Sequence, residues 1–335
     1  MSLAEGLKEA ARAQGAALAG IAQAAPPPQA ALLEAQLAGD RGASLPYLRR
    51  DAAVRQDIRR WYPQARSVLV CGFAYGNEDV RCGPEAGRIA RYAACEDYHR
   101  VLKARMEAVL SWLKTREPGA DGRVFVDSSP VLERLYGAAA GLGWVGKNRL
   151  LISEELGSFF LIAGLALNLP LESDGPVPGR CGACRRCLEA CPTRALGEGR
   201  PFAAGRCIAY LTIEYRGPLP EEHRPAMGNW VAGCDLCQEA CPFNGGPPRP
   251  GTLAPVLSAG IPLEEAARCD EQGFRERFGR TPISRLKARG LKRNALLAMG
   301  NSGLPRFRAA LERSSGDPDP VLGEQARWSL ARLPR

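Results

Sequence analysis

Residues 181–192 read Cys-Gly-Ala-Cys-Arg-Arg-Cys-Leu-Glu-Ala-Cys-Pro, and this stretch decides how the chain is organised. Residues 234–242 read Cys-Asp-Leu-Cys-Gln-Glu-Ala-Cys-Pro, the same run without its first cysteine, which Cys207 upstream can replace. Three thiolates within seven residues can bind three corners of one iron–sulfur cube, while the fourth cysteine, next to a proline, ligates the other cube. The spacing therefore predicts two [4Fe–4S] clusters.

The crosswise pairing divides the eight cysteines into two ligand sets. The first set, which we call cysteine set one, is Cys181, Cys184, Cys187 and Cys241. The second, cysteine set two, is Cys191, Cys207, Cys234 and Cys237. Zinc sites use two separated pairs, and disulfide frameworks belong to small secreted chains, so both alternatives fit less well. Two clusters transfer single electrons, so a redox centre or a substrate must receive them.

Length and composition indicate an ordinary globular protein of two or three domains. The chain has 335 residues, of which 45% are hydrophobic and 24% charged. Residues 1–8 begin an amphipathic helix and carry no export signal. The most apolar stretch, residues 156–171, is interrupted by Ser158, Asn168 and Pro170 and is too short to span a membrane. We therefore expect a cytoplasmic protein with no membrane partner.

The positive charge is concentrated in the last fifth of the chain. The formal net charge is +9, and residues 271–335 contain 14 Lys or Arg against six Asp or Glu. A polyanion such as a nucleic acid is the natural partner of such a field. A solvated basic surface without any partner is the alternative that charge alone leaves open.

Three regions follow from the patterning. Residues 1–174 alternate strand and helix signals and are predicted to form an α/β domain. Residues 175–250 hold the cysteines in a two-cluster ferredoxin-like domain, between linkers at 173–180 and 245–251. Residues 251–335 are predicted to be helical. Strands are expected at 67–73 and 123–126, and helices at 98–115 and 130–140.

The helical tail contains a weak internal repeat. Residues 291–300 and 324–332 resemble each other at a spacing of about 31 residues, with small alanines in a leucine frame. This pattern is typical of paired HEAT-like helices. Because about two repeats cannot form a free-standing solenoid, we expect them to pack on the preceding domain.

Residues 141–146 match the dinucleotide fingerprint G-x-G-x-x-G but in the wrong context. A predicted helix precedes them and an apolar strand follows, whereas the fingerprint needs a strand, a turn and then a helix. Close approach of this backbone to another large cofactor stays open. Among the cysteines outside the two sets, Cys71 is expected in the core, Cys82 and Cys269 are incidental thiols, and Cys95 can line a site.

Asp127 follows a predicted strand and precedes Ser128-Ser129-Pro130, a predicted helix start with Ser129 as its N-cap. Two interpretations of Asp127 stay open: a second capping group near the helix dipole, or a general acid at the end of a strand. His99 and His223 are the only histidines, and neither has the spacing of a metal ligand. Structural or surface roles are expected for both.

These segments together resemble the epoxyqueuosine reductase family. The segment Arg91-Tyr-Ala-Ala-Cys-Glu-Asp-Tyr-His99 is similar to the family's R-Y-A-x-G-x-D-Y-H segment, with Cys95 in place of its glycine. Residues 126–134 and 140–148 are similar to its central signature, and residues 212–217 and 233–238 to its approach to the second cluster. Phe243 stands where tryptophan is usual. The match runs along most of the chain.

The resemblance implies a corrinoid domain at the N-terminus, related to that of reductive dehalogenases. The two clusters would pass single electrons to cobalamin, and the enzyme would reduce epoxyqueuosine to queuosine at the wobble position of tRNA. Asp127 would protonate the epoxide oxygen, which favours an apolar pocket that raises its pKa. No protein histidine is expected on cobalt. The implied partners are tRNA and an external low-potential donor of the ferredoxin or flavodoxin type, and the protein is expected to be a monomer.

The resemblance also suggests contacts for the cofactor and the RNA. Expected cobalamin contacts lie in the matching segments: Arg59, Tyr92, Asp127, Asn148 and Ser158. The expected phosphate contacts are Arg216, Lys292 and Arg293. Two other functions stay open, a corrinoid reductase of a small molecule like the reductive dehalogenases, and a non-enzymatic two-cluster electron carrier or RNA-binding module.

Overall fold

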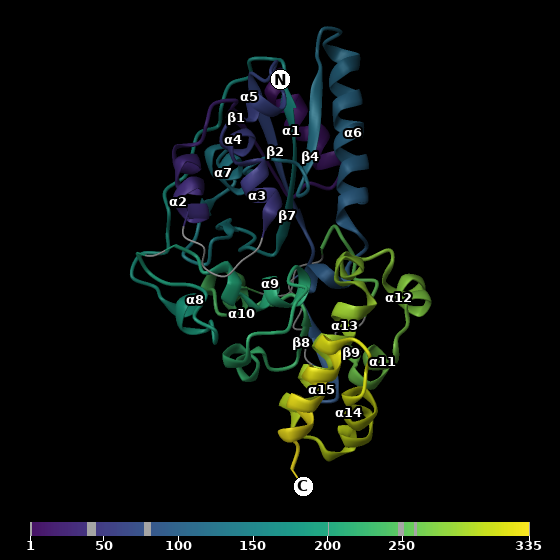
Figure 1. Ribbon diagram of the computed structural model, residues 1–335. Coiled ribbons are helices and arrows are strands. Elements are labelled where there is room, and N and C mark those ends of the chain that lie inside the picture. The colour runs from purple at the N-terminus through teal and green to yellow at the C-terminus, as the bar shows by residue number, and fades with distance from the viewer. Residues whose placement is uncertain are drawn as a thin grey trace.

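The computed structural model describes residues 2–38, 45–76, 82–199, 201–246, 251–257 and 260–334. Its elements lie in three tiers (Figure 1). A sheet with helices on both faces forms one end of the molecule, the cysteine loops lie in the middle, and the C-terminal helices form the other end. The three predicted regions therefore follow one another in space.

The main sheet has four strands in the order β1 (Leu18–Gln23), β2 (Ser67–Ala74), β7 (Phe160–Leu167) and β4 (Gly122–Val126). Every neighbouring pair is antiparallel. All eight residues of β2 are buried. Its uninterrupted apolar sequence is explained by helices that cover both faces of the sheet.

Helices α1 (Leu3–Ala13) and α6 (Tyr98–Arg116) pack on one face of this sheet, and α7 (Glu133–Ala139) packs on the other. Four short helices join β1 to β2: α2 (Leu32–Ala38), α3 (Pro46–Arg50), α4 (Ala52–Gln56) and α5 (Ile58–Trp61). The predicted mixture of helices and strands is confirmed. The prediction that Ser129 caps a helix is wrong, because α7 begins at Glu133 and Leu132 holds the cap position without a side-chain bond.

A second, three-stranded sheet joins the regions. β3 (Ala86–Ile89) is its central strand, parallel to β8 (Trp230–Ala232) and antiparallel to β9 (Gly260–Pro262). The predicted boundaries at 174 and 250 therefore divide this sheet, because β3 belongs to the first region, β8 to the second and β9 to the third. Residues 173–180 form the predicted linker without regular structure, while 247–250 of the second linker lie outside the described residues.

The cysteine region is built from short helices and one hairpin. The hairpin pairs β5 (Trp144–Val145) with β6 (Leu151–Ile152). α8 (Arg186–Glu189) and α10 (Leu236–Glu239) follow the two cysteine runs and pack against each other. α9 (Ile208–Ile213) begins directly after Cys207.

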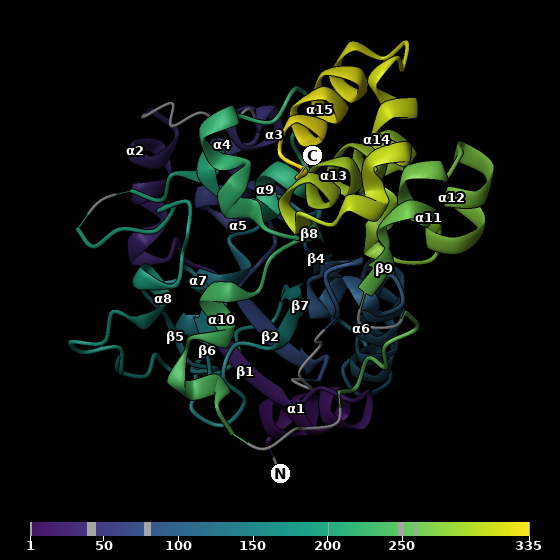
Figure 2. The same cartoon turned by 90° about the horizontal axis from the view of Figure 1, so that it is seen from below.

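The C-terminal region is helical, as the sequence predicts. Figure 2 shows its helices packed beside one another: α11 (Leu263–Arg268), α12 (Glu271–Phe278), α13 (Lys287–Ser302), α14 (Arg308–Ser315) and α15 (Pro320–Ala331). The two similar segments lie in α13 and α15, which contact each other, and α13 also packs against β8. Their shared core includes Leu291, Leu296 and Ala326, all fully buried. In the described part of the chain, no helix has the length and hydropathy required to cross a membrane.

Candidate functional site

The two cysteine sets predicted from spacing also group together in space. Burial raises the pKa of Cys187, and the nearby thiols of Cys241, Cys181 and Cys184 raise it further. Burial likewise raises the pKa of Cys237, with contributions from Cys207, Asp235 and Cys191. Thiols affect each other in this way only when they are neighbours. Cys241 therefore lies with the first run, and Cys191 and Cys207 with the second, which is the grouping that crosswise ligation requires.

The residues of the described ranges contain no group of three His, Cys, Asp or Glu side chains placed to hold one metal ion. A cube does not require such a group, because each of its cysteines binds a different iron atom. The buried thiols with raised pKa values gain from iron, which binds the thiolate and relieves their mutual repulsion. The residues of both sets therefore fit cluster binding.

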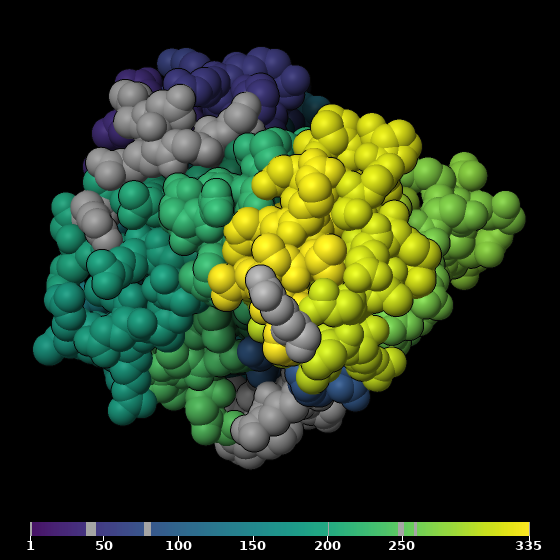
Figure 3. Space-filling model, turned by 60° about the horizontal axis from the view of Figure 1, so that its bottom comes forward, coloured from purple at the N-terminus to yellow at the C-terminus, as the bar shows by residue number. Residues whose placement is uncertain are grey.

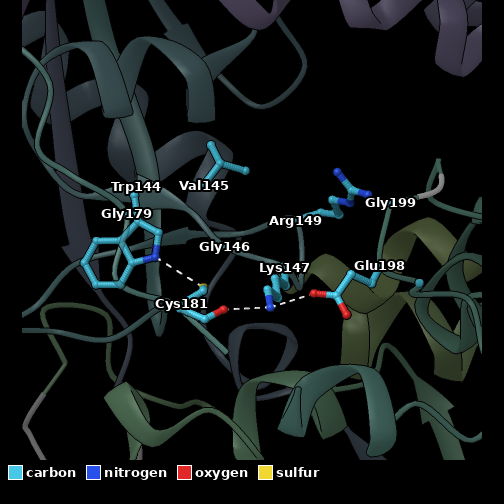
Figure 4. A pocket seen from close by; sticks show the side chains of 11 residues that line it. Trp144, Val145, Gly146, Lys147, Arg149, Gly179, Cys181, Glu198 and Gly199 are labelled. Atoms are coloured by element: carbon cyan, nitrogen blue, oxygen red, sulfur yellow. Dashed lines mark hydrogen bonds and ion pairs between the residues drawn. The ribbon is translucent and has the colours of Figure 1, made fainter. Parts of the chain in front are cut away.

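The first cysteine run rests against the β5–β6 hairpin. The Nε1 atom of Trp144 donates to Sγ of Cys181 at 3.5 Å, and the Trp144 ring meets Phe243 edge to face at 4.9 Å. Lys147 donates to the Gly182 carbonyl at 2.8 Å and pairs with Glu198 at 2.9 Å. Figure 4 shows Trp144, Lys147 and Glu198 around a hollow beside Cys181, whose volume is about 390 Å³. The hairpin thus holds the loop that carries the first ligand.

The glycines at 141–146 serve this hairpin. A Cβ atom at Gly143, where φ is +155°, would lie 1.9 Å from the Ile152 carbonyl oxygen. A Cβ at Gly146 would lie 2.4 Å from the Ile152 side chain. The close backbone approach is therefore to the chain itself, and the helix α7 precedes the motif as the sequence indicated.

Ser158 has a different role from the predicted cobalamin contact. Its side chain is buried, and its hydroxyl donates to Oε1 of Gln238 at 2.8 Å and accepts from Nδ2 of Asn244 at 2.9 Å. Both partners flank Cys241. Because the hydroxyl is already used, the predicted contact is corrected: Ser158 holds the second cysteine run against the sheet domain.

Asp127 ends β4 with an unusual backbone. Its φ is +44°, in the left-handed region that few residues other than glycine adopt. Such a conformation persists where the surrounding contacts enforce it. The buried carboxyl of Glu133 accepts a hydrogen bond from the backbone of Asp127 and so fixes the turn. The Asp127 side chain is 48% exposed.

The Asp127 carboxylate is held by three side chains. His99 Nε2 lies 2.9 Å from its Oδ2, and the hydroxyl of Tyr98 also hydrogen-bonds to it. Arg285 approaches to 3.7 Å from the C-terminal region. Because α6 begins at Tyr98, the start of one helix, the end of one strand and a residue far along the chain meet at this carboxylate. The cap interpretation of Asp127 is wrong, since no helix begins beside it.

The electrostatics of Asp127 differ from the prediction of an apolar pocket. Burial raises its pKa, but the hydrogen bond and charge of His99, and the charge of Arg285, outweigh that effect and lower it. For His99, burial lowers the pKa, yet the bonds to Asp127 and Asp97 outweigh it and the pKa is raised. The pair is therefore an ionised carboxylate beside an imidazolium. His99, for which a structural or surface role is expected, therefore lies in direct contact with Asp127.

Further polar groups surround this pair. Burial and the Asp127 charge raise the pKa of Glu133 well above its usual value. Arg285 pairs with Glu214 at 3.4 Å, and burial together with the charges of Glu214 and Asp127 raises the pKa of Tyr47. Sequence reasoning missed Tyr47, Glu214 and Arg285, because they lie in three distant segments. The matching segments at 91–99 and 212–217 offered a signal for Tyr98, His99 and Glu214, but not for Tyr47 or Arg285.

The expected cobalamin contacts divide into two groups. Asn148 is buried and its Nδ2 has no hydrogen-bond partner, so it keeps a donor to offer. Burial raises the pKa of Tyr92, and the charges of Asp127 and Asp235 raise it further, so Tyr92 lies near both the carboxylate and the second cysteine run. Arg59 instead forms a bidentate pair with Asp57, and it is Arg55 that reaches the Asp127 turn, 3.5 Å from the Ser129 carbonyl. The prediction for Arg59 is not supported by its position.

The expected phosphate contacts also divide. Arg293 is 1% exposed, and its guanidinium donates to the carbonyls of Leu211, Tyr215 and Gly217, so its assignment to RNA is wrong. Arg216 is exposed and holds the carbonyls of Arg285 and Leu286, while Lys292 pairs with Asp317 at 2.6 Å. Figure 3 shows the helical tail as a broad outer face beside the cysteine region.

Comparison with known proteins agrees with this site. The family model of a "4Fe-4S double cluster binding domain" matches residues 180–244, and that of "Epoxyqueuosine reductase QueG, DUF1730" matches residues 55–128. The epoxyqueuosine reductase of Gloeobacter violaceus is 40% identical over 257 residues, which cover 74% of this chain and 81% of that protein. That of Synechococcus sp. is 36% identical over 309 residues, covering 88% and 94%.

Solved structures show the same architecture. The epoxyqueuosine reductase of Streptococcus thermophilus aligns with a TM-score of 0.90 at 25% identity, covering all of this chain and 92% of that one. The Bacillus subtilis enzyme, with an aspartate catalytic loop swung out of its active site, aligns at 0.89 and 28% identity, covering 99% and 90%. A complex with an epoxyqueuosine-modified tRNA-Tyr stem loop aligns at 0.87 and 28%, covering 98% and 89%.

The chain is thus an oxidoreductase with a double iron–sulfur cluster domain. It belongs to the epoxyqueuosine reductase family.

Proposed function

We propose that this protein reduces epoxyqueuosine to queuosine at the wobble position of tRNA, with electrons from its two clusters, bound cobalamin and Asp127 as the proton donor. The observation that carries the proposal is the Asp127 site itself. A half-exposed carboxylate, fixed in the left-handed region and paired with His99, lies where the sheet domain meets the cysteine and helical regions. A proton donor must be positioned within hydrogen-bond reach of its target, and this carboxylate is positioned from three sides.

The protein would hold the substrate so that the epoxide oxygen faces Asp127. As the first carbon–oxygen bond breaks, negative charge develops on that oxygen, and the Asp127–His99 pair supplies a proton to it. Arg285 stabilises the carboxylate that remains. General acid catalysis of this kind contributes about 10²–10⁴-fold.

Cobalamin, when bound, supplies the low-valent metal centre that can deliver electrons to the substrate carbon. Asn148 and Tyr92 are the residues of this chain that we assign to holding it, since one keeps a buried donor and the other lies near both Asp127 and the second cysteine run. The two cysteine sets would hold the clusters, which would supply single electrons from an external carrier of the ferredoxin or flavodoxin type. The protein works as a monomer.

The RNA approaches along the C-terminal region. A related enzyme binds an epoxyqueuosine-modified tRNA stem loop. A base in an anticodon loop can be turned out of its stack and read in a pocket. Arg216 and Lys292 are assigned to phosphate contacts, and Arg285 joins them because it reaches the Asp127 site from the helical region.

The test is a reconstitution. Anaerobically purified protein is incubated with cobalamin, and bound corrinoid is read from the visible spectrum. Reduced protein is then mixed with tRNA that carries epoxyqueuosine, and the nucleoside is analysed by mass spectrometry. The proposal expects a bound corrinoid and loss of one oxygen atom from the nucleoside. Absence of corrinoid binding, or an unchanged nucleoside, contradicts it.

A further inference from the structure

The proposed reaction consumes two protons, and one carboxyl group supplies only one. Removal of the epoxide oxygen breaks two carbon–oxygen bonds, forms one carbon–carbon double bond and releases water. The balance is one epoxide, two electrons and two protons. The electrons come from the external one-electron carrier through the clusters. Asp127 is ionised and carries no proton of its own, so one of the two protons must reach its carboxylate from a neighbouring group, and the other comes from solvent water.

We infer that His99 holds the proton that Asp127 delivers to the epoxide oxygen and passes it to the Asp127 carboxylate, while Asp97 keeps the imidazole oriented. This inference rests on the proposed function and deepens it. His99 is a positioning and proton-holding residue, because it reaches the substrate only through Asp127.

The two hydrogen bonds of His99, together with an ionised Asp127, fit a doubly protonated ring. His99 Nδ1 lies 2.7 Å from Oδ1 of Asp97, and Nε2 lies 2.9 Å from Oδ2 of Asp127. Ionised carboxylates only accept hydrogen bonds, so both nitrogens donate only when both carry hydrogen. Asp97 is itself fixed as the N-cap of α6, accepting from the His99 backbone N–H at 3.1 Å. The imidazole also stacks on Tyr98, with ring centroids 4.2 Å apart.

The other groups that face the pair leave one rival source. Arg285 carries a charge but does not release protons in proteins. Tyr98, Tyr92 and Tyr47 have pKa values raised by burial, which disfavours their ionised forms. Arg134 faces the site as a further cation. Glu133 is the rival, since burial and the Asp127 charge raise its pKa well above the usual value and keep it protonated.

Glu133 is less suited to the transfer. Its carboxyl group accepts a hydrogen bond from the backbone of Asp127 and so fixes the turn. His99 is bonded directly to the carboxylate oxygen, which gives the proton a one-step path. The raised pKa of His99 agrees with an imidazole that carries the transferable proton near neutral pH.

The first experiment measures the ionisation of His99 without substrate. The chain contains only His99 and His223, so the His223→Gln variant of the cluster-loaded protein has a single imidazole to follow by ¹⁵N NMR. We expect a pKa above the usual value of about 6.5, with both nitrogens protonated below it. Asp127→Asn and Asp97→Asn should each lower it, by about one unit. A normal pKa that neither variant changes overturns the inference.

The second experiment measures single-turnover reduction of epoxyqueuosine tRNA against pH. The wild-type rate should fall as the pH rises through the pKa measured for His99. His99→Gln should lose this alkaline fall and about 10–100-fold of the rate, with unchanged tRNA affinity. His223→Gln is the matched control and should behave as wild type. If the alkaline fall in rate is lost in Glu133→Gln but kept in His99→Gln, Glu133 is the proton source and the inference is wrong.

The two experiments separate the inference from the proposed function. The NMR measurement needs neither cobalamin nor tRNA. A wild-type protein that reduces no epoxyqueuosine, although His99 titrates as expected, contradicts the proposed function alone.

Discussion

The cysteine loops and the Asp127 site differ in how their residues are brought together. The cysteines are close in sequence, whereas the groups around Asp127 are close only in the folded chain. Seven of the eight cysteines lie in two runs whose spacing alone nearly fixes their partners. The groups around Asp127 come from residues 47, 97–99, 127–134, 214 and 285, and only the folded chain brings them together. The cluster sites can thus be predicted from local sequence, whereas the Asp127 site is formed only by the tertiary structure.

The two regions also differ in what compensates their negative charges. Burial raises the pKa of Cys187 in set one and of Cys237 in set two, and iron offsets this by binding the thiolates. Around Asp127 the protein supplies the opposite charges itself, from His99 and Arg285. Loss of a ligand therefore disrupts a cofactor, while loss of a partner near Asp127 shifts ionisation and leaves the fold intact.

The largest effect is expected from breaking the cysteine loops. Cys241→Ser removes one ligand of set one although it lies in the second run, so the first cluster should be lost and the second kept. Iron content should fall to about half, and electron transfer to the substrate should stop. Iron analysis and electron paramagnetic resonance check this. Cys71→Ser, in the buried strand β2, is the control for thiol loss and should keep its full iron content.

The next effect comes from Asp127→Asn. The amide keeps the shape of the side chain but cannot donate the acidic proton, so single-turnover reduction should fall about 10²–10⁴-fold. Iron content and tRNA affinity should stay at wild-type levels, which distinguishes this variant from Cys241→Ser. Quench-flow assays with bound tRNA provide the measurement, and a rate within threefold of wild type would remove Asp127 from the acid role.

Arg293 and Lys292 are neighbours with different expected roles. Arg293 is assigned a structural role, and Lys292 a contact with RNA phosphate. Arg293→Met leaves three buried carbonyls without their donors and should lower the free energy of unfolding by about 2–4 kcal/mol. Lys292→Met breaks a partly exposed pair and should cost under about 1 kcal/mol, with weaker tRNA binding at low salt. Denaturant titration and filter binding compare them. Equal destabilisation would contradict the assignment of Arg293.

The smallest effect compares Arg55 with Arg59. Arg55→Gln removes a buried guanidinium that lies against the Asp127 turn, and should slow reduction by several fold. Arg59→Gln breaks a half-exposed pair with Asp57 and should leave the rate unchanged, with a stability loss of about 0.2–1 kcal/mol. Steady-state kinetics on both variants decide this. A larger rate loss for Arg59→Gln would restore the sequence-based expectation.

Much of the fold could be predicted from periodicity. The strands at 67–73 and 123–126 and the helix at 98–115 are present, because their apolar patterns match buried faces. The strand β3 was missed: four residues that pair with strands more than 140 positions away carry little local signal. The start of α7 was misplaced, since Pro130 follows a strained turn at Asp127 and not a helix cap.

The parts of the site that could be predicted are those whose residues form a motif in the sequence. Among the residues that sequence reasoning selected, Asp127 lies beside His99 and Arg285, and the cysteines of each set are neighbours in space. Ser158, Arg59 and Arg293 were chosen for their positions in matching or basic segments. Their side chains are used by the protein itself, which no pattern along the chain reveals.

The sequence by itself determined the cysteine sets, the succession of regions and the basic tail, because spacing, hydrophobic period and charge are properties of neighbouring residues. Tertiary structure alone decided the ionisation of Asp127. Its pKa depends on His99 and Arg285, whose distance from it along the chain bears no relation to their distance in space. Burial alone would have raised that pKa, and the two cations that the fold brings to it reverse the sign.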